Sequence, residues 1–178
     1  VEALPRVKQR ILTSATSDVG IPKFVGLQRP VFINYLREGT SQLTIKTILT
    51  SEKDKLQSLK KALAFIGHQP GIVFCNFKEA LERVSVFLTE NNIHHERFHG
   101  GMEQVDRERA LVKFRNGTCQ LLLATDLASR GLDIPEIRFI LHYHLPPSEK
   151  EFTHRNGRTA RMNRDGVAYI LHDKDEKL

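Results

Sequence analysis

The sequence predicts an α/β fold in which a mostly parallel sheet carries helices on both faces. From residue 51 onward, stretches with apolar residues at helical spacing alternate with short runs of apolar and β-branched residues. These runs are apolar at nearly every position, which is typical of parallel strands that are buried on both sides. With 178 residues and 40% apolar content, the chain is long enough to bury one sizeable core.

Four helices are expected. Gly117 should end the third, and the fourth should open at Ser148 and Glu151, after a Pro-Pro pair, and end near Gly157. In the first expected helix, a capping-box pattern of Ser51 and Asp54 precedes apolar residues that share one face, Leu56, Leu59, Leu63 and Ile66. In the second, the shared face holds Phe77, Leu81, Val84 and Leu88. In the third, within residues 103–115, it holds Ala110, Leu111 and Phe114.

Five strands are expected. They cover residues 71–75, 93–98, 120–124, 137–141 and 167–171, and the pattern at 93–98 is the weakest. Strand and helix therefore alternate along the chain, which is the order of a parallel sheet with helical crossovers.

The first 40 residues follow no such alternation. Gly and Pro are too frequent between residues 20 and 30 for a long regular element, and the polar run REGTSQ at residues 37–42 has the composition of a linker. We therefore expect a boundary there, with residues 1–36 and residues 43–178 as separate parts.

Composition narrows the class of protein. Lys and Arg outnumber Asp and Glu by 27 to 21, a net charge of +6, which favours a polyanionic partner but also occurs in domains that bind none. Cys75 and Cys119 each lie in an apolar run without C-x-x-C spacing, so we expect reduced core cysteines of a cytoplasmic protein. No apolar stretch approaches the roughly 20 residues that span a bilayer, and no membrane partner is expected.

The most informative segment is ATDLASRGLDIP, residues 124–135, which follows the apolar run 121–123. It places Asp126, Arg130 and Asp133 just after a buried strand, where open α/β sheets bind their ligands. Taken singly, each carboxylate could instead be a turn or cap residue, and the arginine a solvated charge. The length of the whole segment favours a site.

A second basic segment, HRNGRTAR, covers residues 154–161. Its arginines recur every third residue, so each step falls about 60° short of a full helical turn and they cannot share one helical face. If the helix ends near Gly157, Arg158 and Arg161 can point at a ligand. Guanidinium groups suit the charge that develops on transferred phosphoryl oxygens. A solvated basic face is the alternative interpretation.

These two segments resemble motifs V and VI of the DEAD-box RNA helicases, a family built of two RecA-like lobes. Ser14-Ala15-Thr16 resembles motif III, which closes the first lobe, and residues 98–107 resemble the H-G and Q-x-x-R elements of the second. The chain contains neither G-x-x-x-x-G-K-[ST] nor Asp-Glu-Ala-Asp, which in the family lie on the first lobe. The resemblance implies a RecA-like second lobe at residues 43–178, preceded by the tail of a first lobe at residues 1–36.

The resemblance also implies ligands and roles. ATP with Mg²⁺, the metal held by the first lobe, and RNA, bound mainly through its sugar-phosphate backbone, are the expected ligands. The intact protein should couple ATP hydrolysis to RNA unwinding, whereas this chain alone should be inactive. The implied roles are catalysis for Arg158 and Arg161; ATP binding for Gly131, Asp133, Arg158 and Arg161; RNA binding for Gly100, Gln104, Arg107, Thr125 and Arg130; and coupling between the lobes for Ser14, Thr16, Asp126, His154 and Arg155.

Three positions depart from the family pattern. Asn156 stands where an apolar residue is usual, Ala160 replaces the second glycine of GRTGR, and Phe77 stands where threonine or serine is common. Because a buried asparagine needs partners, we expect Asn156 to be less enclosed than the family pattern implies. We expect a negative φ at Ala160, since a positive φ would strain an alanine. We expect Phe77 to pack with Leu81 as a hydrophobic staple and assign it no RNA contact.

Other functions compete with this one. The chain could be a lobe of another two-lobed helicase family, although His154 and the RGLDIP segment favour the DEAD-box form. It could also be a nucleic-acid-binding module without ATP turnover, for which Asp133 and Arg161 would be unnecessary.

Some of the candidate residues also have simpler interpretations. Spacing alone would allow Gln104 and Arg107 to be exposed helix residues without a ligand. The histidines at 94, 95 and 99 lack the paired cysteines or carboxylate partner of a metal site, and no metal ligands are assigned.

Overall fold

The computed structural model describes two units of the chain. They are Val1–Thr40 and Ser41–Leu178. The described residues are 9–13, 21, 25–27, 29–33, 43–50, 55–126, 137–160, 165–174 and 176, so the predicted linker at residues 37–42 lies outside them. In the first unit, Arg10 donates a hydrogen bond from Nη1 to the carbonyl of Gly26 at 2.9 Å.

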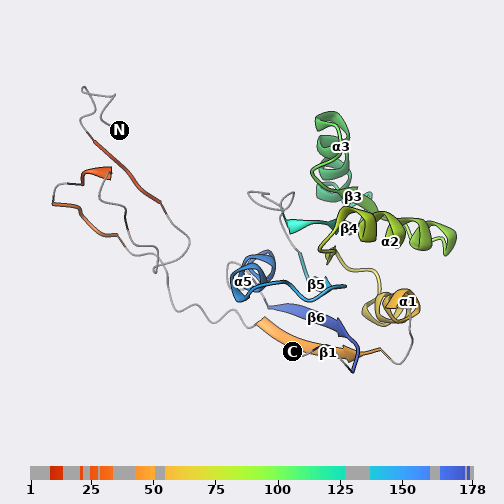
Figure 1. Ribbon diagram of the computed structural model, residues 1–178. Helices are drawn as coiled ribbons and strands as arrows, with labels where there is room; N and C mark the ends of the chain where they lie inside the picture. The colour runs from red at the N-terminus through yellow and green to blue at the C-terminus, as the bar shows by residue number, and fades with distance from the viewer. Residues whose placement is uncertain are drawn as a thin grey trace. The chain divides into compact units, whose positions relative to one another are not determined.

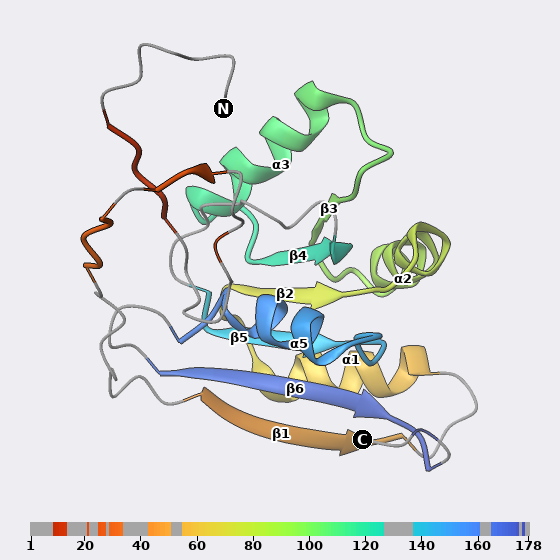
Figure 2. The same cartoon turned by 60° about the vertical axis from the view of Figure 1, so that its left-hand side comes forward.

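The second unit is built on a six-stranded sheet with the order β1-β6-β5-β2-β4-β3, and each of its strand pairings is parallel (Figures 1 and 2). The strands are β1 (Leu43–Leu49), β2 (Gly71–Phe74), β3 (Glu96–Phe98), β4 (Leu121–Ala124), β5 (Phe139–His142) and β6 (Gly166–His172). The helices are α1 (Lys55–Ile66), α2 (Lys78–Glu90), α3 (Gln104–Arg115) and α5 (Glu149–Asn156).

Alternate residues of the central strands pack on opposite sides of the sheet. Val73, Leu123 and Leu141 join the buried apolar residues of α1 and α2 in one cluster. Ile72 and Leu122 join Phe98, Phe114 of α3 and other residues in a second cluster. Burial on both sides explains why the strands are continuous apolar runs, and it confirms the predicted α/β fold with helices on both faces.

Strand β1 was not among the predicted strands. It pairs with β6 from Leu43–Gly166 to Leu49–His172 and lies at the edge of the sheet. Most of its residues are exposed, and Ile45 and Leu49 are half-exposed apolar residues. An edge strand of this kind has neither a continuous apolar run nor a clean alternation, and its pairing partner lies more than a hundred residues away in the sequence.

The ends of the helices follow the predicted signals with one exception. Ser148 caps α5, since its Oγ accepts a hydrogen bond from the Glu151 amide at 3.2 Å, and Gly157 caps the other end. Gly117, with a φ of +77°, follows α3. The predicted staple at Phe77 is wrong: a staple uses the residue before the N-cap, whereas Phe77 is itself the N-cap residue of α2, and it is 65% exposed. The Ser51 and Asp54 pair lies outside the described residues.

Both cysteines are free and buried, as predicted. Burial raises the pKa of the Cys75 thiol to about 12, which leaves it unreactive at neutral pH. None of the helices in the described ranges has the length and apolar character that crossing a bilayer requires.

Candidate functional site

The carboxyl ends of four strands carry three of the predicted RNA-facing and coupling residues that the structure describes, Gly100, Thr125 and Asp126. Because the strands are parallel, these ends lie along one edge of the sheet, in the order β5, β2, β4, β3 (Figure 2). The residues that follow the strands are His144 after β5, Asn76 and Phe77 after β2, Thr125 and Asp126 after β4, and His99 and Gly100 after β3. This is the edge at which open α/β sheets bind ligands.

Arg155 of α5 joins three of these strand ends. Its side chain is 1% exposed and makes a two-pronged ion pair with Asp126, Nε to Oδ1 and Nη2 to Oδ2, both at 2.6 Å. Nη2 also donates to Asn76 Oδ1 at 2.7 Å, and Nη1 donates to the His144 carbonyl at 3.1 Å. The guanidinium lies 5.1 Å from the centre of the Phe74 ring. Arg155 therefore fixes α5 against the segments after β2, β4 and β5.

His142 and Asn156 form a second buried link. His142 Nε2 lies 3.0 Å from Asn156 Oδ1, and since that oxygen can only accept, the His142 proton is on Nε2. The imidazole stacks on Phe152 at 5.3 Å and on Phe74 at 6.3 Å between ring centres. Burial, reinforced by the charge of Arg155, lowers the pKa of His142 to about 4, so its ring is neutral at pH 7.

Asn156 is 5% exposed, and the expectation that this position is less enclosed is wrong. An asparagine is accommodated there because His142 supplies a hydrogen-bond donor to its side-chain oxygen. Its Nδ2 is buried with no hydrogen-bond partner among the described residues. The sequence signal for this pair was weak, because the two residues lie on separate elements, β5 and α5.

The predicted RNA contacts of α3 lie near its first turn. Gln104 is exposed and donates from Nε2 to Glu108 Oε1 at 2.8 Å. Arg107 is half-buried, with its guanidinium 5.0 Å from the centre of the Phe98 ring, and its buried Nε has no hydrogen-bond partner in the part of the chain that the structure describes. The structure thus brings Arg107 to Phe98, the last residue of β3, and Gln104 begins the same helix.

The turn after α5 lies at the opposite edge of the sheet. Thr159 donates from Oγ1 to the carbonyl of Ile137, just before β5, at 2.7 Å. A Cβ added at Gly166, the first residue of β6, would lie 2.6 Å from the Ala160 amide nitrogen. This turn, which begins with Gly157 and Arg158, therefore packs against the starts of β5 and β6. Thr159, which makes the contact with β5, was not among the predicted site residues.

Ala160 has a φ of +52°, so the expected negative φ is wrong. The turn must connect the end of α5 to β6 while it packs closely against Gly166, and these neighbours hold the alanine in the left-handed region.

Of the remaining predicted residues, the structure describes His154 alone. His154 is exposed on α5, and within the described ranges no hydrogen bond or ion pair links its side chain to Asp126 or Arg155. Ser14, Thr16, Arg130, Gly131, Asp133 and Arg161 lie outside the described residues.

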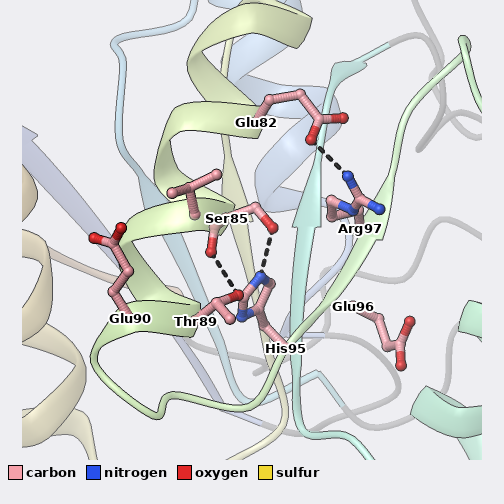
Figure 3. A pocket seen from close by; sticks show the side chains of 8 residues that line it. Glu82, Ser85, Thr89, Glu90, His95, Glu96 and Arg97 are labelled. Carbon is pink, nitrogen blue, oxygen red and sulfur yellow. Dashed lines mark hydrogen bonds and ion pairs between the residues drawn. The ribbon is translucent and has the colours of Figure 1, made fainter.

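A hollow of about 470 Å³ lies between α2 and β3, and none of the residues that line it is a predicted site residue (Figure 3). In it, His95 Nδ1 donates to the Ile93 carbonyl at 2.8 Å, so Nε2 accepts from Ser85 Oγ, also at 2.8 Å. Burial lowers the pKa of His95. Burial alone would raise the pKa of Glu82, but Arg97 and His99 hold it below its ordinary value. Within the described ranges, no three His, Cys, Asp or Glu side chains are grouped as a metal site would require.

Comparison with protein families identifies the domain. Residues 54–163 match the family described as the helicase conserved C-terminal domain. The chain belongs to this family. Its helicase C-terminal domain is of the DEAD-box type, as its relatives and structural neighbours show.

Two relatives illustrate the relationship. The helicase C-terminal domain is 38% identical to DEAD-box ATP-dependent RNA helicase 21 of Oryza sativa subsp. japonica, over 80% of this chain and 20% of the relative. It is 32% identical to ATP-dependent RNA helicase DHH1 of Encephalitozoon cuniculi, over 99% of this chain and 37% of the relative. The chain therefore corresponds to well under half the length of these relatives.

Solved structures of DEAD-box proteins have the same fold. S. cerevisiae Dbp5 bound to RNA and ADP BeF3 matches 76% of this chain and 36% of its own with a TM-score of 0.69 and 25% identity. The RNA helicase Prp28 from Chaetomium thermophilum bound to ADP matches 77% of this chain and 34% of its own with a TM-score of 0.68 and 30% identity. The six-stranded parallel sheet is thus the RecA-like sheet predicted from the sequence.

Proposed function

We propose that the chain is the second lobe of an ATP-dependent RNA helicase and that it contributes RNA-backbone and nucleotide contacts when paired with a first lobe. The observation that carries this proposal is the Arg155 network. It joins Asp126, in the segment that resembles motif V, to α5, in which the segment that resembles motif VI begins. It also joins both to the ends of β2 and β5. A solvated basic face would not bury a guanidinium in this way, whereas a site that must hold two motifs in register requires it.

The carboxyl edge of the sheet would bind RNA. Gly100, Gln104, Arg107 and Thr125 lie there, and Arg130 follows β4 in the sequence. The first turn of α3 has unpaired backbone amides that favour a phosphate, and Arg107 adds a permanent positive charge. Contacts of this kind recognise the sugar-phosphate chain and carry little information about base sequence.

The segments after β4 and α5 would bind ATP. In this proposal Arg158 and Arg161 stabilise charge on the phosphoryl oxygens, and Gly131 and Asp133 approach the ribose. The strained turn at Ala160 restricts the backbone between the two arginines, which favours a defined direction for each. Mg²⁺ would be held by the first lobe, where it would neutralise phosphate charge, and the described residues of this chain offer it no cluster of ligands.

Coupling between nucleotide and RNA would run through the Arg155 network. Asp126 and Arg155 connect the end of β4 to α5, so a displacement of either segment on nucleotide binding would move the other. His154, Ser14 and Thr16 would complete this coupling at the contact with the first lobe.

RNA binding by the chain tests the proposal. Arg107→Ala and Thr125→Ala should weaken binding about equally for unrelated single-stranded RNA sequences, measured by fluorescence anisotropy. Arg107→Ala should also reduce the slope of log K against log salt by roughly one unit.

The matched control for Arg107→Ala is Arg109→Ala, because Arg109 is an exposed arginine of the same helix that pairs with Asp106. It should leave the slope unchanged. A loss of binding that is confined to one RNA sequence would show base readout and contradict the proposed backbone contacts.

A further inference from the structure

Phe77 is an exposed aromatic residue at the centre of the proposed RNA edge. It comes three residues after β2, which lies between β4 and β5, and 65% of its surface is exposed. A phenylalanine ring in water forgoes about 2 kcal/mol or more of burial energy, and here it lies where ligands of α/β sheets bind. No element of the described fold uses it as core.

The backbone that presents Phe77 is held firmly on both sides. Asn76 donates from Nδ2 to the Leu145 carbonyl at 2.9 Å and accepts from Arg155 at 2.7 Å. On the other side, the Phe77 carbonyl accepts the Leu81 amide at 3.1 Å as α2 begins. The backbone that carries the exposed ring is therefore fixed before any ligand binds. A ligand that stacks on the ring would lose little backbone entropy of the protein on binding.

His144 supports the ring from one side. It contacts Phe77 in an edge-type arrangement, 6.3 Å between centres with 62° between the ring planes. The His144 ring is in turn held by the backbone N–H of Asn76, which donates to His144 Nδ1 at 3.4 Å. Burial lowers the pKa of His144, so the supporting ring is uncharged at pH 7.

The residue after Phe77 is a cation that lies near the turn after β3. Lys78 follows Phe77 directly, and a Cβ added at Gly101 would lie 3.0 Å from its Nζ. Lys78 therefore stands beside the turn that contains Gly100, a proposed RNA-backbone contact. An exposed aromatic ring, together with a cation near the proposed path of the RNA backbone, is the combination with which proteins bind single-stranded nucleic acid.

We propose that Phe77 is a stacking platform for one unpaired base of the bound RNA strand, with Lys78 facing the adjacent phosphate. This inference rests on the proposed function, because it assumes that RNA lies along the carboxyl edge. A free nucleotide carries the same base chemistry, and the RNA strand is favoured because the proposed backbone contacts flank Phe77. Stacking accepts any base, so the platform would add affinity without sequence specificity.

The chain contains no tryptophan, so Phe77→Trp would introduce a single fluorescent reporter at this position. Single-stranded oligoadenylate RNA should quench its emission on binding, whereas an abasic oligomer of the same length should bind without that quenching. Phe65→Trp is the matched control. Phe65 is 78% exposed but lies at the end of α1, at the edge of the sheet where β2 begins, and its tryptophan should not respond.

Phe77→Ala should weaken binding of oligoadenylate by roughly 5- to 150-fold and leave binding of the abasic oligomer unchanged, whereas Phe77→Tyr should retain the affinity of the unmodified chain. If the unmodified chain binds no RNA, the proposed function fails and the platform with it. If RNA binds but the emission of Phe77→Trp stays unquenched and Phe77→Ala is neutral, only the platform is overturned. Quenching by AMP but not by oligoadenylate would assign the ring to a free nucleotide and overturn the RNA platform.

Discussion

Ala160 shows strain at a single residue of motif VI. Its φ of +52° lies in the left-handed region, where a Cβ crowds the backbone at a cost of about 1 to 2 kcal/mol. Glycine has no such penalty, although it gains freedom in the unfolded chain. We expect Ala160→Gly to raise the free energy of unfolding by about 0.5 to 1 kcal/mol, measured by urea denaturation.

The control for this glycine substitution is Ala64→Gly. Ala64 is exposed within α1, where glycine should lower the free energy of unfolding by about 1 kcal/mol. A loss of stability in Ala160→Gly as large as that of the control would show that the turn carries no strain.

His142 makes stability depend on pH. Its pKa is about 4 in the folded chain and about 6.5 when unfolded, so the unfolded chain binds more protons between these values. Stability is therefore full above about pH 6.5 and falls as the pH drops toward 4. This histidine alone should account for about 2 kcal/mol of loss between pH 7 and pH 5, which urea denaturation at the two pH values measures.

His142→Gln should remove that part of the loss, although it lowers stability at pH 7 by disturbing the stack with Phe152. His68→Gln is the control, because His68 is exposed and should leave the difference between pH 7 and pH 5 unchanged. An unaltered pH dependence in His142→Gln would mean that folding does not shift the pKa of His142.

At the scale of elements, the position of α5 depends on Arg155. Lysine keeps the charge but cannot make the two-pronged contact with Asp126 while also reaching Asn76 and the His144 carbonyl. We expect Arg155→Lys to lower the free energy of unfolding by about 2 kcal/mol or more, because partly buried acceptors lose the donor that the buried guanidinium supplies. Thermal or urea denaturation measures this.

Arg109→Lys is the matched control for that substitution. Arg109 pairs with Asp106 on the exposed surface of α3, and the exchange should change stability by less than about 0.5 kcal/mol. If the two lysine variants were equally stable, Arg155 would not be the residue that fixes α5.

The elements differ in how far the sequence predicted them. Helices α1, α2 and α3 have apolar residues at regular spacing, and α5 has a cap at Ser148, so these elements were found. β1 was missed because it is an exposed edge strand whose partner, β6, is distant in the sequence. The staple at Phe77 was predicted from spacing alone, which does not reveal that α2 begins one residue too early for Phe77 to occupy the staple position.

At the scale of the whole molecule, catalysis should require a second lobe. The sequence has no phosphate-binding loop and no Asp-Glu-Ala-Asp. We expect the purified chain to hydrolyse no ATP, with or without RNA, because nothing in it holds the phosphates and magnesium together. Phosphate release assays measure this, and RNA-stimulated turnover by the chain would contradict the division of the site between two lobes.

In a two-lobed protein that contains this chain, Arg161→Ala should lower kcat for ATP by about 10³-fold, as arginine-finger losses do. RNA affinity without nucleotide should change little, and Arg164→Ala, three residues after the basic segment, serves as the control. A collapse of RNA affinity with intact turnover would assign Arg161 to RNA instead.

The sequence by itself determined the fold class and the family, and it supplied the residues proposed to carry the chemistry. These follow from local patterns: apolar runs for buried parallel strands, helical spacing, and the contiguous segments at residues 124–135 and 154–161. Such patterns are visible because each is contained within a short stretch of neighbouring residues.

Only the tertiary structure decided which of these residues meet. The contacts of Arg155 with Asn76 and Asp126, the pairing of His142 with Asn156, the exposure of Phe77 and the positive φ of Ala160 each depend on segments brought together from different strands. A buried side chain takes the partner that the sheet order places beside it, and the order β1-β6-β5-β2-β4-β3 cannot be read from spacing along the chain.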